Sequence, residues 1–123
     1  MKKILLAVVV LVLVISGIVM ALPATPNPTT ISWTAPTLNT DGTPLTDLAG
    51  YKIYYGTATG VYGTPKDVGN VMTYPISSVV TTKGTYFLVV TAYNTAGDES
   101  DYSNELSFRL KSIPAKPTGV KVQ

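Results

Sequence analysis

The sequence has neither cysteine nor histidine among its 123 residues. Without these residues the chain has no disulfide bond, no thiolate zinc site and no nucleophilic centre that relies on a cysteine or on a histidine base. No other group of residues has the spacing of a catalytic centre. We therefore expect a protein that is not an enzyme, with no catalytic residues, no metal site and no cofactor.

Charge of either sign is also scarce, since only 13% of the residues are charged and the formal net charge is +2. Both excess positive charges, Lys2 and Lys3, lie at the start of the chain, and the sequence after residue 21 has equal numbers of basic and acidic residues. Nucleic-acid binding depends on neutralising phosphates with a basic surface. A nucleic-acid partner is therefore excluded.

The first 21 residues form an export segment. Two lysines precede residues 4–22, which are apolar except for Ser16 and Gly17. This pattern is typical of a signal peptide cleaved after Ala21. An uncleaved anchor is the alternative, because 19 helical residues span roughly 28 Å, almost the thickness of the bilayer core. In both interpretations the rest of the chain is secreted or extracytoplasmic, and it contacts a membrane only if the segment stays uncleaved.

The remaining sequence predicts a short spacer and one all-β domain. Residues 22–28 contain three prolines and read as an extended spacer. Residues 29–110 alternate apolar and polar positions, favour Thr, Tyr, Val and Ile, and are interrupted by turn residues. Six strands are expected, at residues 29–34, 50–56, 65–68, 71–77, 85–93 and 100–110, and Pro75 should place the fourth at a sheet edge. The predicted core residues are Trp33, Tyr51, Ile53, Tyr55, Tyr86, Leu88 and Val90.

Five motifs carry a family resemblance. They are T-I-S-W-T-A-P at 30–36, D-G-T-P-L at 41–45, G-Y-K-I-Y-Y-G at 50–56, T-Y-F-L-V-V-T-A-Y-N at 85–94 and A-G-D-E-S-D-Y-S-N-E at 96–105. Together they resemble a bacterial fibronectin type III domain over residues 29–110. The resemblance implies an immunoglobulin-like two-sheet β-sandwich with Greek-key connections. It also implies that the Tyr86 ring is buried and that its hydroxyl bonds to nearby backbone.

The sequence departs from this family at two places. The segment V-V-T-T-K-G-T-Y at 79–86 lacks the proline that usually precedes this tyrosine, which leaves open whether Val79 or Val80 fills the corner. A full first strand normally lies well before the tryptophan, but only the proline-rich residues 22–28 are present between the export segment and the domain. We therefore expect the first strand to be missing or degenerate.

The C-terminal residues 111–123 supply a counterpart to that missing strand. The run K-P-T-G-V-K-V at 116–122 resembles the linker and first strand of another type III domain. One interpretation is a frayed tail or the relic of a truncated tandem array. The other is a strand donor, with Thr118, Val120 and Val122 on one face, which pairs in cis or with another molecule to give a homo-oligomer.

One face of the predicted sheet is a candidate partner surface. Alternation places Lys52, Tyr54, Phe87, Val89 and Tyr93 outward. Three interpretations stay open: ordinary cross-strand packing, a protein contact, or stacking on a glycan. The acidic residues at positions 98, 99, 101 and 105 do not match a calcium-loop spacing and read as a solvated loop.

These observations favour a non-catalytic extracytoplasmic module that binds or spaces other components. Its partner would be an unknown protein or a cell-surface polysaccharide. The alternative is a structural subunit of an extracellular assembly, formed by strand exchange through the C-terminal tail.

Overall fold

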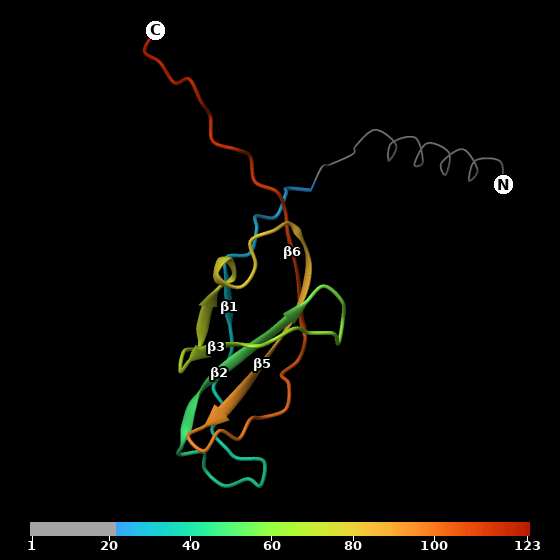
Figure 1. The fold of residues 1–123 in the computed structure, drawn as a ribbon, viewed down its shortest axis with the longest axis vertical. Coiled ribbons are helices and arrows are strands. Elements are labelled where there is room, and N and C mark those ends of the chain that lie inside the picture. Colours follow the sequence, from blue (N-terminus) through green and yellow to red (C-terminus); the bar gives the residue numbers. More distant parts are fainter. Residues whose placement is uncertain (1–21) are drawn as a thin grey trace, which may run out of the picture.

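The computed structural model describes residues 22–123, so the expected export segment, residues 1–21, lies outside the described part of the chain. The described residues form strands and one short 3₁₀ turn (Figure 1). Within residues 22–123, no helix is long and apolar enough to cross a membrane. In chain order the elements are β1 (Thr30–Ser32), β2 (Leu48–Gly56), β3 (Lys66–Gly69), β4 (Thr73–Pro75), η1 (Ile76–Ser78), β5 (Gly84–Asn94) and β6 (Leu106–Leu110).

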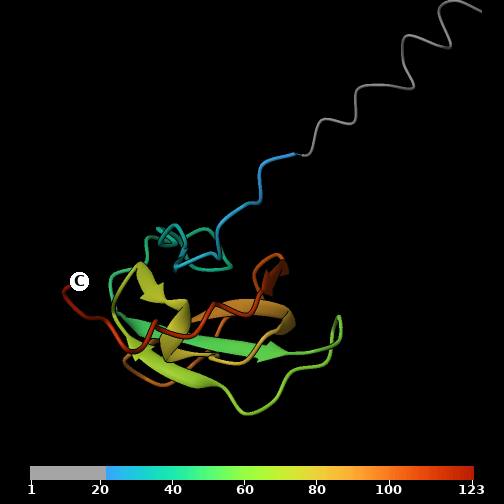
Figure 2. The same cartoon turned by 90° about the horizontal axis from the view of Figure 1, so that it is seen from above.

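The strands form two antiparallel sheets. One sheet has four strands in the order β3-β2-β5-β6, and the other has two, β1 and β4. The long strands β2 and β5 lie side by side at the centre of the larger sheet (Figures 1 and 2) and pair from Leu48 and Asn94 to Gly56 and Phe87. Pro75 lies at the edge, as expected, because β4 pairs only with β1 among the described strands.

The core lies between the two sheets. Alternate residues of β2 and β5 face it, because side chains of a strand point to opposite faces in turn. Five of the seven predicted core residues are buried, and Trp33 and Tyr55 are partly buried and pack against them. The buried apolar set of this cluster is Ile31, Tyr51, Ile53, Ile76, Val80, Tyr86, Leu88 and Val90.

Tyr86 has the buried ring and the hydroxyl bond to nearby backbone that the sequence predicts. Its side chain is 7% exposed, and its hydroxyl donates to the carbonyl of Thr82 at 2.9 Å and lies 2.7 Å from the Thr82 hydroxyl. The buried valine before it is Val80, at 8% exposed, while Val79 is only partly buried. The structure therefore assigns the corner position that the sequence left open to Val80.

The prediction that the last strand begins at residue 100 is wrong, since β6 begins at Leu106. Two serines explain the difference. Ser100 and Ser103 each accept a hydrogen bond on the side-chain oxygen from a β5 amide, and each donates its own amide to a β5 carbonyl. These serines are three positions apart in the sequence, whereas their partners Ala92 and Val90 are two positions apart. The extra residue is a bulge that interrupts the regular ladder.

The chain enters and leaves the domain at the same end. The side-chain amide of Asn27 donates to the carbonyl of Lys111 at 3.1 Å, and the Lys111 amide donates back to Asn27 Oδ1 at 2.9 Å. Residues 22–29 contain no strand, so β1 has no neighbour within residues 22–123 on the side away from β4. From Lys111 the tail runs away from the domain (Figure 1).

Candidate functional site

The outer face of the four-stranded sheet carries the predicted partner surface. The register places Tyr54 opposite Val89, and it places Tyr93 and Phe87 opposite Gly50 and Gly56. Residues directly opposite one another share a face. The five predicted residues therefore lie together on the face that points away from the core. They do not form the open row of exposed aromatic side chains that the sequence predicts.

Val89 is only 2% exposed and offers no surface to a partner. It lies directly opposite Tyr54, whose ring packs against Tyr102 with centroids 5.1 Å apart. A second contact joins Tyr102 to Tyr62, with centroids 5.4 Å apart and perpendicular rings. These three tyrosines form an interlocked cluster, of which Tyr102 is 56% exposed. The sequence did not indicate this cluster, because Tyr102 lies 40 residues or more along the chain from the other two tyrosines.

Glu99 links three side chains at the centre of the outer face. Its carboxylate accepts hydrogen bonds from the Tyr54 hydroxyl at 2.6 Å, from the Thr91 hydroxyl at 2.6 Å and from Lys52 Nζ at 3.1 Å. The Thr91 and Tyr54 hydroxyls and the Lys52 ammonium hold the pKa of Glu99 below its ordinary value. In return, the hydrogen bond to Glu99 raises the pKa of Tyr54 to about 12.

Tyr93 is fixed in a similar way at the end of this face. Its hydroxyl donates to Asp67, with both carboxylate oxygens 2.9–3.0 Å away, and Lys52 Nζ lies 5.5 Å from the centre of its ring. The ring lies over Gly50, where a Cβ atom would come within 2.5 Å of the Tyr93 hydroxyl oxygen. Glycine at this position therefore makes room for the tyrosine.

Glu105 ties the loop after β2 to the segment before β6. Its carboxylate accepts hydrogen bonds from the Thr59 hydroxyl at 2.5 Å, from the Gly60 amide at 2.9 Å and from the Tyr62 hydroxyl. These donors lower the pKa of Glu105. The hydroxyls of Tyr54, Tyr62 and Tyr93 are thus all bonded to carboxylates of this chain, which favours packing within the domain over stacking on a glycan.

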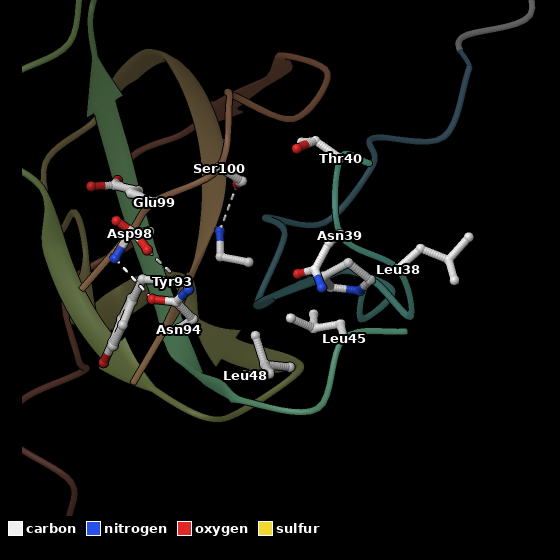
Figure 3. Close-up of a pocket in the computed structure, with 12 residues that line it drawn as sticks. Leu38, Asn39, Thr40, Leu45, Leu48, Tyr93, Asn94, Asp98, Glu99 and Ser100 are labelled. Atoms are coloured by element: carbon white, nitrogen blue, oxygen red, sulfur yellow. Dashed lines mark hydrogen bonds between the residues drawn. The ribbon is translucent and has the colours of Figure 1, made fainter. Parts of the chain in front are cut away.

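A groove at one end of the domain offers a more open surface (Figure 3). It lies between the loop that follows β1 and the segment that follows β5, and it has a volume of about 310 Å³. Leu45 and Leu48 lie toward this space, while Asn94, Asp98 and Ser100 lie on the opposite side. The combination of an apolar wall and a polar wall is typical of sites that bind another molecule.

Both walls of this loop groove are shaped by their own hydrogen bonds. In the loop after β1, Asp41 Oδ1 accepts from the amide and hydroxyl of Thr43, and Asn39 bonds to Thr43 and to the carbonyl of Pro44. In the facing segment, Asn94 Oδ1 accepts from two amides, those of Ala96 and Asp98. The glycines Gly42 and Gly97 have φ values of 85° and 90°, which favour glycine in these tight turns.

The described residues contain no cluster of metal-binding side chains. Within residues 22–123, no three histidine, cysteine, aspartate or glutamate side chains gather in a way that could hold a metal ion. Among the acidic residues that follow β5, Glu99 and Glu105 accept hydrogen bonds from side chains of the outer face, and Asp98 and Glu99 line the loop groove.

The three predicted strand-donor residues lie in the exposed tail and not in any strand. Val120 is 88% exposed and Val122 is 101% exposed, and Thr118 is also exposed. The structure does not bring them to the domain.

Comparisons with known proteins find no family model, no curated protein and no solved structure that matches this chain.

Proposed function

We propose that this protein is a non-catalytic, extracytoplasmic module of the fibronectin type III kind, whose loop groove contacts a protein partner. The order of its strands supports the family. With β1 to β6 taken as strands B, C, C′, E, F and G of an immunoglobulin-like sandwich, a sheet C′-C-F-G faces a sheet B-E, and residues 22–123 contain no strand A. The Tyr86 hydroxyl bonded to Thr82 backbone supports the same assignment.

The loop groove carries the functional part of the proposal. Its walls come from two connections that meet at one end of the domain, and a rigid sandwich commonly presents its binding residues on such loops. Pro36, Leu45 and Leu48 give it an aliphatic wall. Aliphatic side chains suit the apolar side chains of a protein, whereas sugars favour a flat exposed aromatic ring. A protein partner is therefore preferred to a polysaccharide.

A site-directed photocrosslink tests the partner. A photoreactive amino acid replaces Thr40 on the rim of the loop groove, and a matched variant carries it at Thr57, which is also exposed and lies just after β2. Irradiation of the producing cells should give a discrete protein adduct from position 40 that position 57 does not give. Leu38→Asp, at a rim residue that is 57% exposed, should reduce that adduct.

The same adducts from both positions, or none from position 40, would contradict a protein partner at this groove. Titration of the purified protein with cell-surface polysaccharides provides the competing measurement. A shift in Tyr93 or Asn94 resonances with a polysaccharide, together with no adduct from position 40, would assign the groove to a glycan instead.

Export is the second part of the proposal and depends on the pattern of residues 1–21. The intact mass of the protein recovered outside the cytoplasm measures it. A mass corresponding to residues 22–123 indicates cleavage after Ala21, and the full mass in a membrane fraction indicates an anchor. Recovery of the full-length chain only from the cytoplasm would refute export.

A further inference from the structure

A second groove, here called the edge groove, runs beside β1 and has a volume of about 420 Å³. One wall is formed by β1 and the two residues that follow it, and the other by the segment that leads into β6. Core residues of β5 also reach it, so the groove opens onto the apolar interior of the sandwich. Its lining residues are Ile31, Ser32, Trp33, Thr34, Leu88, Val90, Ser103, Asn104 and Leu106.

The backbone of β1 is unpaired along this groove. Ile31 lies opposite Tyr74 of β4, and the flanking residues Thr29 and Trp33 also bond toward the β4 side. Alternate residues of a strand direct their N–H and C=O groups to opposite edges. Thr30 and Ser32 therefore point these groups away from β4, where they have no backbone partner within residues 22–123. Such an edge is a template for another strand.

The C-terminal tail has the properties of that strand. It forms no secondary structure, and its apolar side chains Ile113, Val120 and Val122 are 78%, 88% and 101% exposed. Residues 118, 120 and 122 fall on one face of an extended chain. Gly119 has a φ of 66°, and glycine can change from this value to an extended one without steric cost.

The charges of the tail and of the groove wall are complementary. Residues 111–123 contain three lysines and no acidic residue, whereas residues 98–105 contain four acidic residues and no basic one. Within residues 22–123 the single ion pair is that of Lys52 with Glu99, so Asp98 and Asp101 have no ionic partner there. Asp101 lines a shallow recess that continues the edge groove past Trp33.

We propose that residues 118–122 of one copy pair antiparallel with β1 of a second copy and fill its edge groove. Val120 lies opposite Ile31, and Thr118 lies opposite Trp33. Gly119 and Lys121 then lie opposite Ser32 and Thr30 and take up their unpaired N–H and C=O groups. Because each copy receives one tail and donates another, the contact is heterologous and builds open chains. This pairing does not depend on what the loop groove binds.

A buried pair of aromatic side chains lies beside this register. Tyr51 is 2% exposed and packs edge-on against Trp33 with ring centroids 5.3 Å apart, and both residues line the recess beside the edge groove. Burial raises the pKa of Tyr51, and its interaction with the Trp33 indole N–H opposes that rise, so these two buried polar groups interact with each other. In the proposed register Thr118 lies opposite Trp33, beside this pair.

A second copy fits better than the molecule's own tail. The Asn27 and Lys111 hydrogen bonds hold the start of the tail at the end of the domain where β1 begins. A tail that turned back directly after Leu110 would run parallel to β1. Parallel pairing is slightly less stable per residue than antiparallel pairing. A tail from another copy can pair antiparallel to β1.

Mass measurement over a concentration series provides the first test. The exported protein is purified with whatever N-terminal segment it retains, in a non-denaturing detergent that keeps this segment from associating. The wild-type mass should rise with concentration, and a variant that ends at Ser112 should remain monomeric. Val120→Asp should weaken association by about tenfold or more, the effect expected from one buried valine. Val61→Asp, at a residue that is 65% exposed in the loop after β2, should not.

The proposal would be overturned if the wild type and the variant that ends at Ser112 were both monomeric at every concentration. It would also be overturned if the masses of both rose equally with concentration. The chain contains a single tryptophan, Trp33, so its emission provides an independent reading of edge-groove occupancy. The emission should shift with concentration in the wild type and stay constant in the shortened variant.

A disulfide crosslink tests the register and the direction of exchange. The natural chain has no cysteine, so Thr30→Cys with Lys121→Cys introduces the sole thiols, at positions that lie opposite one another in the proposed pairing. Mild oxidation should give a ladder of multimers that reductant reverses. The matched pair Thr30→Cys with Val120→Cys, whose side chains point to opposite faces, should give far less. A crosslinked monomer would show that the tail pairs within its own molecule and would overturn exchange between copies.

Discussion

Substitution of Gly50 by alanine should destabilise the domain through Tyr93. A Cβ atom at position 50 would lie 2.5 Å from the Tyr93 hydroxyl oxygen, 2.8 Å from the adjacent ring carbon and 3.0 Å from the carbonyl carbon of Gly69. The tyrosine ring must therefore move away. When it moves, its hydrogen bonds to Asp67 and its contact with Lys52 are lost.

The magnitude follows from three terms. Alanine in place of glycine in a strand ordinarily stabilises by roughly 0.5–1 kcal/mol. Displacing a packed ring costs about 1–3 kcal/mol, and losing the hydrogen bond costs about 0.5–1.5 kcal/mol. The net loss in the free energy of unfolding is about 2 kcal/mol, which corresponds to roughly 8–16 °C in the thermal midpoint of a domain of this size.

A double-mutant cycle provides the assay. Thermal and urea unfolding are followed by Trp33 fluorescence for Gly50→Ala, Tyr93→Ala and the double variant. Once the ring is absent, Gly50→Ala should cost less than about 1 kcal/mol, since only the close approach to Gly69 remains. Additive effects, or a Gly50→Ala variant as stable as the wild type, would refute the role assigned to Tyr93.

The remaining predictions concern the core, the buried tyrosine and the outer face. Ile53 is fully buried, so Ile53→Ala should lower the free energy of unfolding by about 2–5 kcal/mol and Ile53→Val by about 1 kcal/mol, measured by urea unfolding; equal effects would contradict tight packing at this position. Tyr86→Phe removes the hydroxyl that donates to Thr82 and should cost about 1 kcal/mol in the same assay, whereas an unchanged stability would show that this hydrogen bond contributes nothing. The pKa of Glu99 is lowered by folding, so its contribution to stability is complete above its ordinary pKa of 4.5 and is lost as the pH falls through the folded value. Glu99→Gln should flatten the dependence of the thermal midpoint on pH in that acidic range, and an unchanged pH profile would rule out this carboxylate as its source. The pKa of Tyr54 is raised to about 12, so in an absorbance titration Tyr54→Phe should remove a phenol that ionises late, near pH 12; loss of one that ionises near pH 10 would contradict its bond to Glu99.

The sequence predicts the strands well because their alternation records which side chains face the core. The face assigned to Tyr51, Ile53 and Tyr55 is the inner one, and the neighbouring Lys52 and Tyr54 lie on the outer one. The edge position of Pro75 follows from its missing N–H group in the same way. Local chemistry is sufficient for these features, since each depends on a residue and its near neighbours.

Features that depend on distant segments could not be read from the sequence. Glu99 and Glu105 appear in the sequence as members of a solvated acidic loop, but they accept hydrogen bonds from side chains more than 40 residues earlier. The bulge at Ser100 and Ser103 depends on side-chain oxygens that replace backbone carbonyls. Alternation alone therefore extended the last strand six residues too far toward its start.

The paired hydrogen bonds between Asn27 and Lys111 have a mechanical consequence. They place the incoming and outgoing chain side by side, so a pulling force applied to both ends would enter and leave at one pole of the domain. Such a force opens the bonds of Lys111 with Thr25 and Asn27 first and does not shear β2 against β5. While the bonds of Lys111 with Thr25 and Asn27 hold, the domain would lie beside the line of load and carry none of it.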